Sequence, residues 1–252
     1  VGRNVQGSMV RGNRIAGGNL ADLTSVTTGA TAGLGVPEFP KAVVAYLFDE
    51  PGSAAEKPNR FVQNAIGGLR SAAGEVTRLG GAGIALHARG NSRGALTISS
   101  SRVSDLGPGF PRSGLLVDTQ GAAEVMLDIE DTSVTGAHES SDGILMVAQY
   151  RSAITANIRR YRYIGGNPGQ GVGNNGLEVV TYYGPNWLQA GSPAPERHAA
   201  QARVLLEESD IDGSGGFGIA VWNIFGKPGA GTVLDFGGGE LGGRGANRVF
   251  NS

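Results

Sequence analysis

A short motif recurs along the chain about every thirty residues, and this repeat constrains the fold more than any other feature. Each copy begins with one glycine and a short apolar segment, and the five copies start 31, 29, 33 and 42 residues apart. The starting glycines are Gly83, Gly114, Gly143, Gly176 and Gly218. A second and a third apolar segment follow each start. Short strands and turn residues at this period predict a parallel β-solenoid, because no single coil can bury its inner side alone.

The corner between the second and third segments is the most regular part of the repeat. An apolar residue ends each second segment and another lies five positions later: Val10/Ile15, Phe61/Ile66, Ile98/Val103, Ile129/Val134, Ile158/Tyr163, Leu206/Ile211 and Phe236/Leu241. We expect each series to stack into an inward ladder over about seven coils. Two residues before each third-segment residue lies Asn13, Asn64, Ser101, Thr132, Tyr161, Ser209 or Gly239. The small polar members of this set are expected to hydrogen-bond along the stack, with a local rearrangement at Tyr161.

The composition agrees with one large repeat domain. Glycine accounts for 44 of 252 residues, more than twice its average share of about 7%, as a fold with several tight corners per coil requires. We therefore expect residues 1–252 to form a single domain, which begins in mid-pattern as a piece of a longer chain would. Residues 16–41 and 184–200 interrupt the repeat and are predicted to be loop excursions.

Charge and residue types argue against several classes of function. The chain has 21 Lys and Arg against 22 Asp and Glu, so no basic surface for nucleic acid is evident. It has no cysteine and no apolar run long enough for a membrane-spanning helix. His87, His138 and His198 lack the spacing of metal ligands. The segment Asp210–Gly213 resembles the start of a calcium loop without its later glutamate, so no metal or cofactor is predicted.

The repeat resembles the right-handed parallel β-helix superfamily, often called pectin-lyase-like, and especially its parallel β-helix repeat proteins. The likeness lies in the glycine-led strand starts and in the corner sequences NRIAGG from Asn13, SRVSDLG from Ser101, TSVTG from Thr132 and SDIDG from Ser209. It implies an all-β, single-stranded right-handed parallel β-helix and a secreted, periplasmic or cell-surface location. This superfamily includes lyases, hydrolases, epimerases, adhesins and phage tailspikes, so the resemblance alone implies no single activity.

Alternate residues of the first segment should face outward, because side chains alternate along a strand. This rule gives two outward columns, Val44, Ala85, Leu116, Leu145, Glu178, Ala220 and Tyr46, His87, Asp118, Val147, Val180, Trp222. Their apolar members predict an exposed face, and Tyr182 and Tyr183 at the strand end would add an aromatic platform for sugar rings. Large exposed apolar patches usually mark an interface or a binding groove. Alternatively, the loops after Gly18 or Gly184 cover this face.

Two hypotheses about function follow. The first is a non-enzymatic extracytoplasmic module that binds a protein partner, a second copy or a glycan through Tyr46, Leu116, Leu145, Val147, Val180, Tyr182, Tyr183 and Trp222. The second is a polysaccharide lyase or glycoside hydrolase acting on an acidic polysaccharide. In that case His87 and Asp118, about 5 Å apart on adjacent coils, would transfer protons. A solvated surface pair is the simpler interpretation of these two residues.

Overall fold

The computed structural model describes residues 2–17, 42–49, 57–107, 112–138, 141–166, 175–182, 199–224 and 230–250. These residues form strands, turns and bends, and no helix occurs among them. The strands build three sheets, and successive strands of the chain join the first, second and third sheet in turn. We call one strand of each sheet, in that order, a repeat unit. This topology is compatible with the predicted β-solenoid.

Each sheet consists of parallel strands. The first sheet contains β1 (Gly2–Arg3), β4 (Ala42–Phe48), β8 (Ala82–Ala88), β11 (Arg112–Thr119), β14 (Ser141–Gln149), β17 (Leu177–Tyr182) and β20 (Ile219–Ile224). The second contains β2 (Met9–Arg11), β5 (Asn59–Val62), β9 (Arg93–Ser99), β12 (Glu124–Glu130), β15 (Ala153–Arg159), β18 (Gln201–Glu207) and β21 (Gly231–Asp235). The third contains β3 (Arg14–Gly17), β6 (Ala65–Arg70), β10 (Arg102–Ser104), β13 (Ser133–Ala137), β16 (Arg162–Gly165), β19 (Asp210–Asp212) and β22 (Arg248–Phe250).

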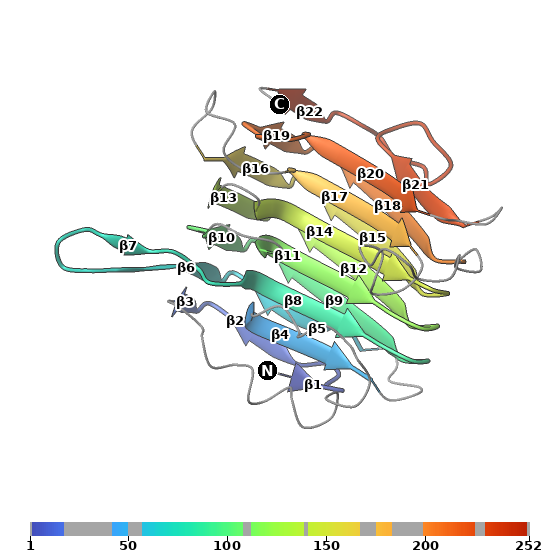
Figure 1. Cartoon of the computed structure of the whole chain (residues 1–252), viewed down its shortest axis with the longest axis horizontal. Helices are drawn as coiled ribbons and strands as arrows, with labels where there is room; N and C mark the ends of the chain where they lie inside the picture. The colour runs from blue at the N-terminus through green and yellow to red at the C-terminus, as the bar shows by residue number, and fades with distance from the viewer. Residues whose placement is uncertain are drawn as a thin grey trace, which may run out of the picture.

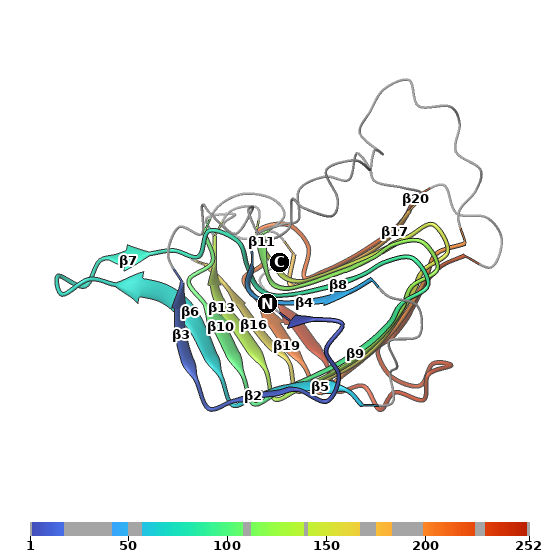
Figure 2. The same cartoon turned by 90° about the horizontal axis from the view of Figure 1, so that it is seen from below.

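The units stack in chain order from β1 at one end to β22 at the other (Figure 1). Viewed along the stack, the three sheets enclose a common interior (Figure 2). One hairpin leaves the stack, because β6 runs on beyond the third sheet and pairs antiparallel with β7 (Val76–Thr77). We call residues 69–77 the arm.

The inward ladders of the second and third sheets fill this interior as predicted. Ile129 pairs in register with Ile98 on one side and Ile158 on the other, and each of the three is at most 1% exposed. In the third sheet, Val134 lies in register between Val103 and Tyr163. Each side chain of this size contributes about 2 kcal/mol of stability through burial.

The repeating glycine exists because each unit closes tightly. A Cβ added to Gly83 at the start of the first strand would lie 2.5 Å from Val103 Cγ1 on the third strand of the same unit. Gly114 faces Val134 and Gly176 faces Ile211 in the same close way. A side chain at these positions would overlap the inward ladder of the third sheet.

The corner between the second and third sheets uses one left-handed residue in each unit. Gln63, Ser100, Asp131, Arg160 and Glu208 all have φ between 48° and 56°. The residue after each of them occupies the position of the predicted polar ladder. In several units its backbone N–H donates to the side chain at the same position of the next unit. Asn64 N donates to Ser101 Oγ at 3.2 Å, and Tyr161 N donates to Ser209 Oγ at 3.1 Å.

Tyr161 departs from the small polar pattern, as expected, and its ring fills the interior. The side chain is 1% exposed, and its hydroxyl donates to the carbonyl of Gly176 at 3.2 Å. Gly143 has no Cβ that would meet this hydroxyl. The expected local rearrangement is therefore an aromatic side chain that fills the interior beside the repeat glycines Gly143 and Gly176.

The prediction for the last unit is wrong at Leu241 and Gly239. The residue in register with Ile211 is Val249, and Ser209 N donates to Asn247 Oδ1 at 3.0 Å. The chain makes a loop first, because the Asp235 carboxylate accepts hydrogen bonds from the backbone N–H groups of residues 237, 239, 241 and 243. Phe236, predicted to face inward, is 44% exposed at this end of the stack.

Candidate functional site

His87 and Asp118 are neighbours, but they are not a solvated pair. They lie in register on β8 and β11, with His87 Nδ1 3.5 Å from Asp118 Oδ2. The histidine side chain is 3% exposed and the aspartate side chain 16%. Gln149 Nε2 donates to Asp118 at 2.6 Å and Gln120 Nε2 donates to it at 3.2 Å. Because two amides already occupy this carboxylate, the arrangement suits a structural network better than proton transfer.

The predicted apolar face is mostly a second hydrophobic cluster. Leu116 is 3% exposed and Leu145 is 1% exposed, and both pack with the alanines of β4 and β8, while Val147 and Val180 pack against them partly buried. Leu116 and Leu145 are therefore not available as a solvent-exposed docking surface. Two loop excursions, residues 16–41 and 184–200, were expected as possible covers for this face. Most of each lies outside the described residues.

Tyr46 does not belong to the outward column. Val44 pairs with Ile84 and Tyr46 with Leu86, so the predicted register of β4 is wrong by one residue and Ala45 and Leu47 take the outward positions. Tyr46 is 3% exposed and packs in the main core, and this burial raises the pKa of its hydroxyl. The Tyr182 side chain and Tyr183 lie outside the described part of the chain.

Three polar residues that were not predicted as a group meet near the starts of β14 and β17. Asp142 is fully buried, and its Oδ1 accepts a hydrogen bond from the backbone N–H of Asn175 at 2.9 Å. The side chain of Asn175 donates to Glu178 Oε2 at 2.6 Å and accepts from the backbone N–H of Phe217 at 2.9 Å. Asn175 therefore fixes both carboxyl groups. We call Asp142, Asn175 and Glu178 the acid cluster.

The Glu178 carboxyl group of the acid cluster has a shifted pKa. Burial raises the pKa of Glu178, and the nearby polar groups of Asn175, Trp222 and Asp142 lower it in part. Burial raises the pKa of the nearby Tyr163 hydroxyl, and the negative charge of Asp142 raises it further.

An exposed aromatic pair lies beside the acid cluster. Trp222 is 46% exposed and Phe217 is 57% exposed, and their ring centroids are 6.4 Å apart at an interplanar angle of 68°. Trp222 lies close enough to Glu178 to lower the pKa of that carboxyl group, and it lies in register with Val180 on the outer face of the first sheet. Among the predicted binding residues whose side chains the structure describes, Trp222 is thus the one placed at an open surface next to polar groups.

The sequence holds one signal that could have pointed to the acid cluster. Asp142 and Asn175 each lie directly before a repeat glycine, Gly143 and Gly176, so the repeat itself places them on neighbouring strands. Glu178 was assigned correctly to the outward column, in register with Leu145. A buried acid one position before the repeat glycine was the missed feature.

The described part of the chain contains neither a cluster of metal-ligand side chains nor a membrane-spanning helix. Among these residues no three His, Asp or Glu side chains come together as a metal site would need, and none of them forms a helix that could cross a bilayer. No protein-family model, curated protein or solved structure matches the chain.

Proposed function

We propose that the chain is a right-handed parallel β-helix of about seven coils, of the pectin-lyase-like kind, that binds a glycan outside the cytoplasm. Its binding surface is the outer face of the first sheet around Trp222, Phe217 and Glu178. The observation that carries the proposal is the exposed aromatic pair fixed next to the acid cluster. Aromatic faces bury the apolar side of a ring-shaped ligand, while a few placed polar groups fix its orientation.

The arrangement favours a glycan over a protein partner. The large aliphatic side chains Leu116 and Leu145 are already buried, so they cannot form the desolvated apolar centre that a protein interface has. What remains open is a pair of rings beside the partly exposed Glu178 carboxyl group, which the buried Asn175 amide holds in place. Sugar hydroxyls can donate to the Glu178 carboxyl group and accept from it when it is protonated.

The test is a screen of the purified protein against a glycan array, followed by titration of the best glycan. Trp222→Ala should weaken binding about tenfold or more, the usual effect of removing a central aromatic contact. Phe236→Ala is the matched control, because it removes a similarly exposed ring from the end of the second sheet. The proposal fails if no glycan binds, or if Trp222→Ala and Phe236→Ala bind as the unchanged protein does.

A second candidate function is glycan cleavage, as a lyase or glycoside hydrolase. The observation that favours it is the acid cluster, because a carboxyl group with a raised pKa near a second, buried carboxyl group is typical of general acid–base sites. This version assigns proton transfer to Glu178 and Asp142 in place of His87 and Asp118. Incubating the bound glycan with the protein and measuring new reducing ends tests it. Cleavage by the unchanged protein that persists in Glu178→Gln would exclude this role for Glu178.

A further inference from the structure

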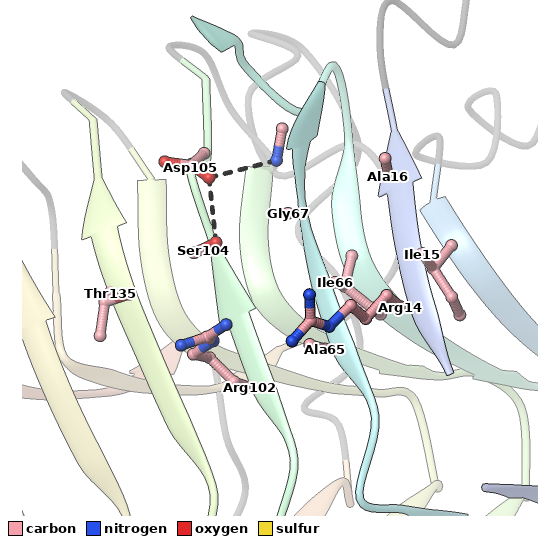
Figure 3. Close-up of a pocket in the computed structure, with 11 residues that line it drawn as sticks. Arg14, Ile15, Ala16, Ala65, Ile66, Gly67, Arg102, Ser104, Asp105 and Thr135 are labelled. Carbon is pink, nitrogen blue, oxygen red and sulfur yellow. Dashed lines mark hydrogen bonds between the residues drawn. The ribbon is translucent and has the colours of Figure 1, made fainter. Parts of the chain in front are cut away.

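We infer that the outer face of the third sheet carries a second binding site, for a ligand with an oxyanion group, at the base of the arm. The site is a hollow of about 500 Å³ bordered by β3, β6, β10 and β13. It is separate from the acid cluster, which lies on the first sheet. Figure 3 shows the residues that line it.

The hollow exists because β6, the strand between β3 and β10, has only small residues on its outer face before the arm begins. β6 contributes Ala65, Gly67 and Gly68 between two strands with larger outward residues. A Cβ on Gly67 would lie 2.8 Å from Ser104 Oγ, and one on Gly68 would lie 2.6 Å from the Thr77 carbonyl in the arm. Because these glycines have no side chains, the hollow stays open above β6 where the arm leaves the sheet. We call this surface of β6 the floor.

Two arginines flank the floor. Arg14 and Arg102 each pair in register with Ala65 from opposite sides, so their Cα atoms are two strand spacings, about 10 Å, apart. Both side chains are exposed on the outer face, as Figure 3 shows. Neither has a hydrogen bond or ion pair among the described residues. Most other arginines here do, such as Arg248, which Asp210 holds at 2.7 Å. Guanidinium groups of this kind bind carboxylate, sulfate or phosphate.

The opposite side of the hollow carries groups for hydroxyls. Asp105 Oδ2 accepts from the backbone N–H of Gly68 at 3.3 Å and from Ser104 Oγ at 3.0 Å, and Thr135 adds a hydroxyl. The lining thus has two cationic groups and one anionic group. A ligand with its oxyanion between the arginines and its hydroxyl groups toward Asp105 matches this division of charge. An acidic sugar, with a carboxylate or a phosphate on a hydroxylated ring, has that chemistry.

The experiment titrates the full chain with D-glucuronate, glucose 6-phosphate and glucose at low salt, by calorimetry or chemical-shift perturbation. These three probes share a sugar ring and differ in the charged group. At least one acidic sugar should bind saturably and more tightly than glucose, and the preferred one identifies the oxyanion. Failure of both acidic sugars to bind more tightly than glucose would overturn the inference.

Variants separate this site from general electrostatic attraction. Arg14→Gln combined with Arg102→Gln should weaken binding by about tenfold or more, because charge-assisted hydrogen bonds are lost. Ala65→Leu keeps every charge but fills the floor, and should also weaken binding. Arg60→Gln is the control, since Arg60 is exposed on the second sheet in the repeat unit that contains Ala65. Equal losses in Arg60→Gln, or full binding by Ala65→Leu, would contradict a defined pocket. Circular dichroism verifies that each variant is folded.

Discussion

The substitution Gly83→Ala tests whether each repeat unit closes tightly, because tight closure decides whether alanine raises or lowers the free energy of unfolding. Gly83 has no positive φ, so alanine can adopt its backbone conformation. Without a steric obstacle, alanine in a strand should stabilise the protein by about 0.5–1 kcal/mol, because glycine loses more conformational freedom on folding. The structure predicts the opposite sign.

The size of the predicted loss follows from the contacts. A Cβ at this position would lie 2.5 Å from Val103 Cγ1 and 2.8 Å from the carbonyl oxygen of Gly114. Val103 is 2% exposed and β-branched, so it cannot rotate away freely. Overpacking of this kind costs about 1–3 kcal/mol.

Urea unfolding of the full chain, followed by circular dichroism, measures this loss as a lower midpoint. Val103→Ala alone should also destabilise the protein, but the double variant should lose less than the sum of the two, by about 0.5 kcal/mol or more. A higher midpoint for Gly83→Ala, or strict additivity with Val103→Ala, would refute the close-packing explanation of the repeat glycine.

Three further substitutions test other parts of the fold. Ile129→Ala in the second-sheet ladder should cost about 2–5 kcal/mol in urea unfolding, and a loss below about 1 kcal/mol would mean that this side chain is not in a packed core. Tyr161→Phe removes the buried hydrogen bond to the Gly176 carbonyl and should cost about 1 kcal/mol, whereas an unchanged midpoint would argue against that bond. Backbone donors, chiefly that of Gly237, lower the pKa of Asp235, so its contribution to stability is complete above the ordinary aspartate pKa near 4 and is lost as the pH falls through the folded value. The thermal midpoint of the unchanged protein should therefore fall more between pH 6 and pH 3 than that of Asp235→Asn, and equal falls would contradict this role.

The regular part of the fold could be predicted from the sequence because its signal repeats in space. Ile98, Ile129 and Ile158 occupy equivalent positions in successive units, and the structure pairs them directly. The prediction was wrong where the local sequence departs from the repeat motif. β4 has no starting glycine to fix its register, so Tyr46 was placed on the wrong face. In the last unit, a loop around Asp235 displaces the third strand to Val249.

The candidate site was predicted only in part, because burial and side-chain contacts do not follow from periodicity. The pattern placed His87 next to Asp118, but it could not show that Gln149 holds that carboxylate. It also placed Leu145 on the outer face without showing that this residue is buried there. The acid cluster depends on the hydrogen bonds by which Asn175 holds Asp142 and Glu178, and periodicity alone does not reveal those bonds.

Disulfide trapping tests the stacking of units most directly, because the chain has no cysteine of its own. Asp128 and Asn157 are exposed register partners whose side chains hydrogen-bond at 3.0 Å. Their strands lie about 4.8 Å apart, within the Cα range of a disulfide. Thr97 pairs with the other side of Asp128, so it lies about 10 Å from Asn157, beyond that range.

The variant with Asp128→Cys and Asn157→Cys should form an intramolecular disulfide under mild oxidation of the folded protein, as measured by mass spectrometry of its peptides. The variant with Thr97→Cys and Asn157→Cys should keep free thiols under the same conditions. Absence of the first disulfide together with formation of the second would contradict the register on which the stacked repeat units, and both proposed sites, depend.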